Sequence, residues 1–306
     1  MGASTPASKD AAGSADGAGR GHLNAFTGHF RDGIRGAVRR LSRVGAQVLK
    51  HADPEALFDR ADRGGLDAAQ EGCSVAITAR DAANLEKAAK AIANETGRRI
   101  LPLPGDMSKP EDVHRCVDQA IAEFGHIDIL VPCAGSSPGG LLEDLTEEQW
   151  FSSLSLKFMG YVRTVRAVIP HMRERGSGSI VLVVGNDGLK PSYWELTAGI
   201  ANAADINFVS SIAEQYGRCG IRVNTVNPGP VNTDRWDGLE KALARDKKVS
   251  QERAHELAVA SIPLGRICEP GEVASVVTFL ASPAASFVNG AHIPIDGAQR
   301  KAIMDT

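Results

Sequence analysis

The chain has 306 residues, a formal net charge of −3 and 43% hydrophobic residues, which suits one large α/β domain or two small ones and excludes disorder throughout. Acids and bases are interspersed, so no basic face argues for nucleic acid or a membrane surface, and a small-molecule partner is favoured. No stretch approaches the roughly 20 apolar residues of a membrane span, and we find no apolar signal core. The five cysteines form no CxxC pair, which favours a reducing compartment over a zinc site or disulfide framework. We therefore expect a cytoplasmic protein without a metal.

The N-terminal part of the chain is the least regular. Residues 1–21 are almost entirely Ala, Gly, Ser, Thr, Asp and Lys, a composition that predicts a disordered tail, which we extend over residues 1–33. Residues 34–50 place Ile34, Val38 and Leu41 at helical spacing and predict an amphipathic helix. Residues 34–71 are interpreted as this helix followed by a degenerate first βα unit.

From residue 72 onward, strands and helices alternate regularly. The run "CSVAITARD" predicts a strand, residues 82–97 a helix ending at Gly97, and "RRILPLPG" a strand before a helix with Ser108 as its N-cap and Pro110 in its first turn. Further strands are predicted at 126–135, 178–185, 221–231 and 291–297, and further helices at 147–171 and 201–217. Apolar strands separated by helices of this length predict a single α/β domain over residues 72–300, with one doubly wound parallel sheet.

Four sequence blocks carry a family resemblance: "FGHIDILVPCAG", "RVNTVNPGPVNTD", "PLGRICEPGEVASVVTFLAS" and "FVNGAHIPIDG". In this order and spacing they resemble the short-chain dehydrogenase/reductase family over roughly residues 72–300. The resemblance implies a Rossmann-type fold, an NAD(P) cofactor, an oxidoreductase reaction on an alcohol or carbonyl, and a homodimer or homotetramer. In such an assembly the helices at 150–169 and 203–216 would bury faces against a symmetry mate.

The resemblance also assigns cofactor-binding positions, most of which directly follow strands. Arg80 ends the second strand of the family pattern, where its donors would pair with a 2′-phosphate and slightly favour NADP over NAD; the alternative is a surface pair with Asp81. Asp106 and Met107 match the residues that flank adenine, or else are a helix cap and a core residue. The positions that lead to the nicotinamide are Cys133, Ala134, Gly135, Pro228, Gly229, Val231 and Thr233.

The phosphate-binding glycine loop of the family, TGxxxGxG, has no clear counterpart here. "TGHFRDGIRG" at residues 27–36 is one residue too long, and Arg35 stands where a glycine belongs. The alternative takes "AQVLKHA" as the first strand, which leaves Gly64 and Gly65 late in the following helix and acids where phosphates would lie. With either alignment we expect weakened pyrophosphate binding.

All four catalytic positions of the family are changed. Gly185 falls at the catalytic serine, Ala198 at the tyrosine, Asn202 at the lysine and Lys157 at the asparagine. The first three cannot give up a proton, so the general acid catalysis of the family, worth roughly 10²–10⁴-fold, is lost at these positions.

Neighbouring residues could rebuild the site. Lys157 and Tyr193 would form a lysine–phenol pair, and Asn186 could donate to a substrate carbonyl. We favour an NAD(P)-dependent oxidoreductase with this non-standard site. The alternatives are a catalytically inactive member that serves as a binding or oligomer partner, and lyase-like chemistry through a Schiff base on Lys157. The substrate-covering segment would run from Thr233 to about Ile262, but its residues single out no substrate class.

Overall fold

The computed structural model describes residues 65–70 and 72–300, and the N-terminal tail and helix predicted above lie outside this range. Residues 65–70 are helical and lead to β1 (Val75–Ala79), α3 (Ala82–Thr96), β2 (Ile100–Pro104) and α4 (Pro110–Phe124). As predicted, α3 ends at Gly97, which adopts the left-handed conformation (φ +66°). The predicted N-cap of α4 is wrong: Lys109 occupies that position, while the Ser108 hydroxyl donates to the Asp106 carboxylate at 2.7 Å.

The remaining elements follow the predicted alternation, with one difference. The helix expected at 147–171 is divided by a π-helical turn, η2. In chain order the elements are β3 (Ile129–Leu130), η1 (Leu142–Asp144), α5 (Glu147–Ser153), η2 (Leu154–Phe158), α6 (Met159–Arg175), β4 (Gly178–Val183), η3 (Asn186–Gly188), α7 (Leu196–Gly217), β5 (Ile221–Pro228), α8 (Asp234–Lys247), α9 (Gln251–Ala260), α10 (Pro270–Ala281), η4 (Pro283–Ala285) and β6 (His292–Ile295).

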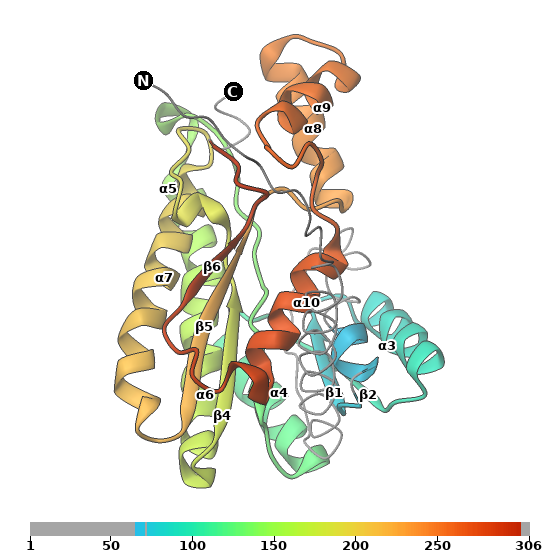
Figure 1. Cartoon of the computed structure of the whole chain (residues 1–306), viewed down its shortest axis with the longest axis vertical. Coiled ribbons are helices and arrows are strands. Elements are labelled where there is room, and N and C mark those ends of the chain that lie inside the picture. Colours follow the sequence, from blue (N-terminus) through green and yellow to red (C-terminus); the bar gives the residue numbers. More distant parts are fainter. Residues whose placement is uncertain (1–64, 71, 301–306) are drawn as a thin grey trace, which may run out of the picture.

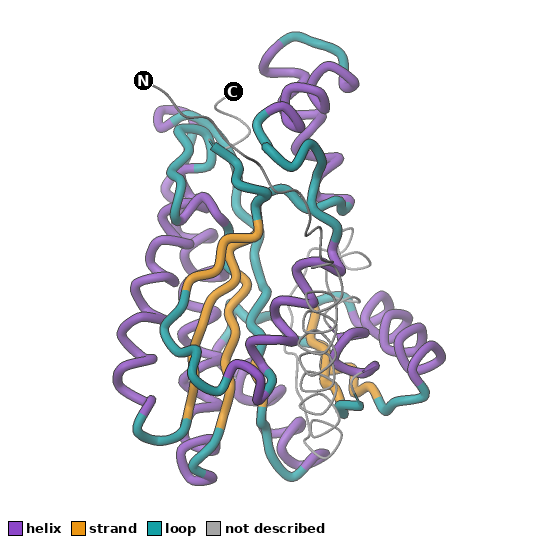
Figure 2. Tube along the Cα trace, viewed as in Figure 1, coloured by secondary structure: helices purple, strands orange, loops and turns teal. Residues whose placement is uncertain are grey.

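The described strands form two parallel sheets, where we predicted one continuous sheet. β1 pairs with β2, and β3, β4, β5 and β6 pair in that order (Figure 2). No strand among residues 65–70 and 72–300 bridges β1 and β3. The segments considered above for the first strand of the family pattern lie before residue 65, outside the described part of the chain.

Both faces of the strands are covered, as a doubly wound fold requires. One apolar cluster joins β1 and α3 to the second sheet and to α10, whose Val277 and Leu280 pack beside Val181 and Val226 (Figure 1). The opposite cluster unites α4, α6 and α7 with β3, β4 and β5. Because the first cluster contains residues of both sheets, the two sheets share one core.

A small helical pair, α8 and α9, follows β5 and lies at one end of the molecule (Figure 1). It has an apolar cluster of its own, built around Trp236, Leu243 and Ala258. No helix in the described part of the chain is apolar over a length that would cross a bilayer. The pair α8 and α9 directly follows β5 and thus lies near the carboxyl end of that strand.

Candidate active site

A cavity of ≈ 110 Å³ lies where β3, β4 and β5 end. Its walls come from Cys133, Ala134 and Gly135 after β3, from residues 183–187 after β4, and from residues 228–231 after β5. Parallel strands present their carboxyl ends at the same edge, so residues distant in sequence meet there. Besides Lys157 and Asn186, six predicted site residues line this cavity: Cys133, Ala134, Gly135, Pro228, Gly229 and Val231. Thr233 is not part of the lining, and its hydroxyl donates to the Val231 carbonyl at 3.3 Å.

Lys157 reaches the cavity from the π-helical turn η2. The helix before this turn begins with a capping box, in which Thr146 and Gln149 satisfy each other's backbone N–H groups. A π turn widens the helix by one residue and often marks a functional position. A Cβ added to Gly135 would lie 3.5 Å from the Lys157 Nζ, so the ammonium faces the glycine turn after β3.

Asp205 is a buried acid beside this lysine that we did not predict. It lies on α7, is 0% exposed, and neither of its carboxylate oxygens has a hydrogen-bond partner. Burial raises the pKa of Asp205 to about 8, and the positive charge of Lys157 opposes that rise. The aromatic rings of Phe158 and Phe208 meet edge to face at 6.4 Å and pack η2 against this part of α7.

Asp187 and Asn202 form a buried contact beside Gly185. Asp187 is buried in the cavity wall, and its Oδ1 accepts a hydrogen bond from the Asn202 amide. A Cβ added to Gly185 would collide with that same Oδ1 and lie 2.5 Å from the Asn202 Nδ2. The carboxylate and the amide therefore fill the space that a side chain at position 185 would need.

The tyrosines of the chain are placed differently. Tyr161 lines the cavity, but its hydroxyl donates to the Val183 carbonyl at 2.8 Å. Tyr193 lies on the loop before α7 with 53% of its surface exposed, and it is not among the residues that line the cavity. The structure thus brings Lys157 and Asn186 together and leaves Tyr193 at the surface.

The C-terminal segment closes one side of the cavity. The Asn186 amide donates to the Gln299 Oε1 at 2.8 Å, and Gln299 itself lines the cavity. Lys190 holds this segment by bonds to the Asp296 carboxylate and to the Gln299 carbonyl. The predicted role of Asn186 as a substrate donor therefore competes with its bond to Gln299.

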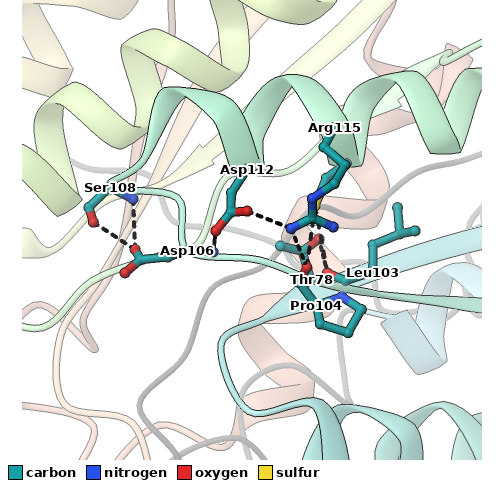
Figure 3. Close-up of polar contacts among 8 residues, drawn as sticks. Thr78, Leu103, Pro104, Asp106, Ser108, Asp112 and Arg115 are labelled. Carbon is teal, nitrogen blue, oxygen red and sulfur yellow. Dashed lines mark hydrogen bonds and ion pairs between the residues drawn. The ribbon is translucent and has the colours of Figure 1, made fainter.

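Of the predicted adenosine-side residues, Arg80 directly follows β1, whereas Asp106 and Met107 follow β2. Figure 3 shows the polar contacts of Asp106. Asp106 turns its carboxylate back to Ser108, accepting from the backbone N–H at 2.9 Å and from the hydroxyl. Its own N–H donates to Asp112, which is paired with Arg115 at 2.6 Å. Met107 is buried in the core, and Arg80 is exposed just after β1. Asp106 thus accepts bonds within the turn before α4, and it is not the helix cap of our alternative interpretation, because Lys109 is the N-cap residue.

Buried polar atoms without partners gather around the cavity. Among the described residues these atoms belong to Asn202, Asp205, Trp236 and, elsewhere, Asp128. Such atoms are rare in folded proteins and often mark a functional site. Our sequence analysis missed Asp187, Asp205 and Gln299. The available signal was an acid in an otherwise apolar stretch of helix at 205, whereas the other two depend on contacts distant in sequence.

Comparisons with known proteins agree with this architecture. The family model described as enoyl-(acyl carrier protein) reductase matches residues 65–298. The peroxisomal 2,4-dienoyl-CoA reductase of Danio rerio is 31% identical over 229 residues, covering 74% of this chain and 73% of that protein. The 3-oxoacyl-[acyl-carrier-protein] reductase of Thermotoga maritima is 31% identical over 229 residues, covering 75% and 88%.

A solved structure of similar fold is actinorhodin polyketide ketoreductase with NADPH, with a TM-score of 0.79 and 25% identity over 83% of this chain and 97% of that one. The family match extends through the strands, the cavity and the C-terminal segment described above. The chain belongs to the short-chain dehydrogenase/reductase family of oxidoreductases.

Proposed function

We propose that this protein is an NAD(P)-dependent oxidoreductase, with NADP favoured, that acts on a small alcohol or carbonyl substrate through a non-standard site centred on Lys157. One observation carries the proposal. Lys157 is the cationic side chain that η2 directs at the Gly135 turn, within the cavity formed by the ends of three strands. It is a proton-carrying group within the cavity where the proposed reaction needs a general acid.

The residues around the cavity fit the nicotinamide end of the cofactor. Ala134 and Gly135 leave backbone accessible on one side, and the loop from Pro228 to Val231 forms the opposite wall. When bound, the cofactor supplies or accepts a hydride. The NADP preference is supported by the NADPH-containing relative and by the position of Arg80, exposed after β1. Both candidate glycine loops precede or border the described residues, so pyrophosphate binding remains an expectation.

In the reduction direction, Lys157 would donate a proton to the developing oxyanion, and Asn186 would help orient the substrate carbonyl if its bond to Gln299 exchanges. Asp205 supplies a compensating carboxyl group behind the lysine. Tyr193 joins this arrangement only through movement of the loop that holds it, because it starts from the surface.

The test is a titration with NADPH and NADH, followed by turnover with a panel of ketones, aldehydes and secondary alcohols. We expect NADPH to bind more tightly than NADH and at least one substrate to oxidise it. Absence of binding at millimolar concentration would contradict the proposal and favour an inactive family member. Borohydride trapping of a carbonyl compound on Lys157 without nucleotide would instead favour the lyase-like alternative.

We also propose a homo-oligomer, in which a partner subunit covers the faces of α5, α6 and α7. Phe151, Met159 and Ile200 on these helices are exposed, with 65% of the Phe151 surface open. Exposed apolar side chains of this size favour burial against a second copy. A monomer in light scattering at micromolar concentration would contradict the assembly.

A further inference from the structure

A second cavity adjoins the first on its outer side. It measures ≈ 160 Å³ and shares Glu195, Ala198, Arg235 and Leu239 with the wall of the Lys157 cavity. A substrate with its carbonyl at Lys157 would extend its other end into this outer cavity.

Part of the outer cavity wall is apolar, and a glycine leaves room for it. The Trp194 ring lies directly against Gly139, where an added Cβ would collide with the ring carbons. The Gly140 N–H donates to the Trp194 carbonyl at 2.9 Å and ties the two loops together. With Leu239 on the other side, the walls suit a short aliphatic chain.

Arg235 is the cation of this outer cavity. It lies in the first turn of α8 and is half-buried, yet within residues 65–70 and 72–300 its guanidinium has neither a carboxylate nor a carbonyl partner. Arg266, by contrast, forms two bonds with Glu272. A guanidinium is a fork of donors that matches a carboxylate in two parallel bonds.

The next residue, Trp236, also provides a hydrogen-bond donor. Trp236 is buried in the wall of the Lys157 cavity, and its indole N–H has no acceptor. Two residues in the first turn of α8, Arg235 and Trp236, therefore line the Lys157 cavity with donors that lack acceptors among the described residues. Glu195 lines both cavities as well, and its negative charge would weaken binding of an anion.

We propose that the substrate carries a carboxylate on a short aliphatic chain, and that Arg235 is the residue that selects it. The oxo or hydroxyl group lies at Lys157 and the carboxylate at Arg235, so the substrate is an oxo acid or hydroxy acid. The position of the reacting group rests on the proposed function, whereas binding of the carboxylate does not.

Matched probes separate charge from shape. We would measure the binding of 4-oxopentanoate, 5-oxohexanoate and 6-oxoheptanoate, each against its methyl ester, by quenching of tryptophan fluorescence, since two of the three tryptophans lie at the cavities. We expect at least one acid to bind about 10- to 100-fold more tightly than its ester. Equal binding of acids and esters, or binding of neither, would overturn the proposal.

Variants locate the effect. Arg235→Met should remove the preference for the acid and leave ester binding unchanged, while Glu195→Gln should strengthen acid binding. Arg245→Met is the matched control, because Arg245 lies at the far end of the same helix and is paired with Asp246. Acid binding that survives Arg235→Met would overturn the assignment. If the acids bind through Arg235 but no nicotinamide cofactor binds, the proposed function fails and the carboxylate site stands.

Discussion

Two regions at the carboxyl ends of the strands differ in whether their acidic side chains have hydrogen-bond partners, and the pKa values of these acids are shifted in opposite directions. At the ends of β1 and β2, Asp112 accepts from the Asp106 N–H and pairs with Arg115, and these bonds hold its pKa below the usual range (Figure 3). At the ends of β3 to β5, Asp205 has no hydrogen-bond partner and its pKa is raised to about 8. Polar groups with hydrogen-bond partners indicate a structural role for the first region. Buried polar groups without partners cost free energy, and they indicate a functional site in the second region.

We expect the largest effect from substitution of Lys157, which lies in the region of Asp205, and this effect is on turnover. Lys157→Met keeps the length of the side chain and removes its proton, so we expect turnover of any identified substrate to fall by roughly 10²–10⁴-fold. Steady-state kinetics at constant cofactor concentration measure the loss, and circular dichroism checks the fold. Lys90→Met, which changes an exposed lysine on α3, is the control. Wild-type turnover in Lys157→Met would remove Lys157 from the chemistry.

Asp205 gives the second effect, in stability as a function of pH. Because burial raises the folded-state pKa of Asp205 to about 8, well above its ordinary value, the folded state retains a proton that the unfolded state loses. The resulting stability is present below about pH 4 and is lost as the pH rises toward 8. Between pH 5 and 8 the wild type should therefore lose roughly 2–4 kcal/mol relative to Asp205→Asn. Urea unfolding of both proteins at these pH values tests this, and parallel pH profiles would show that Asp205 ionises normally.

Gly185 tests whether the Asp187–Asn202 pair excludes a side chain at the serine position. In Gly185→Ala, the new methyl group meets the Asp187 carboxylate and the Asn202 amide, and we expect a loss of about 1–3 kcal/mol in unfolding free energy. In an Asp187→Ala background most of this loss should disappear, because the colliding oxygens are gone. A double-mutant cycle measured by chemical denaturation would show additive losses if the two positions were independent.

Asp112, which has hydrogen-bond partners, should give a smaller effect on stability, and its pH dependence has the opposite sign to that of Asp205. Its folded-state pKa is lowered, chiefly by the hydrogen bond from Arg115, so its contribution to stability is present above its unfolded-state pKa and is lost as the pH falls through the folded-state value. Since the pair is partly exposed, Asp112→Asn should cost at most about 1 kcal/mol at pH 7 and less at pH 3. A stability loss that grows on acidification would contradict this.

Tyr193 gives the smallest expected effect. Its side chain is more than half exposed and lies outside the cavity lining, so Tyr193→Phe should change turnover by less than about threefold. Parallel kinetics with Lys157→Met provide the comparison. A loss as large as that of Lys157→Met would mean that the loop before α7 closes over the cavity and that the predicted lysine–phenol pair forms during catalysis.

Periodicity and turn residues in the sequence were enough to predict most elements of this protein. Gly97 ends α3 because glycine adopts the left-handed conformation without strain, and the apolar runs at 178–185 and 221–231 became β4 and β5 because buried parallel strands are apolar on both faces. The assignment of Gly185, Ala198, Asn202 and Lys157 to the catalytic positions of the family also came from spacing within single elements, and it stays a prediction.

Only the tertiary structure decided what surrounds those positions. The Lys157–Asp205 pair joins η2 to α7, Asn186 meets Gln299 across more than a hundred residues, and Arg235 faces an outer cavity whose other wall is Trp194. The π-helical turn that aims Lys157 replaces what local periodicity predicts as an uninterrupted helix. These features arise from packing between elements, and the free energy of such contacts depends on which distant groups the fold brings together, which local sequence patterns do not encode.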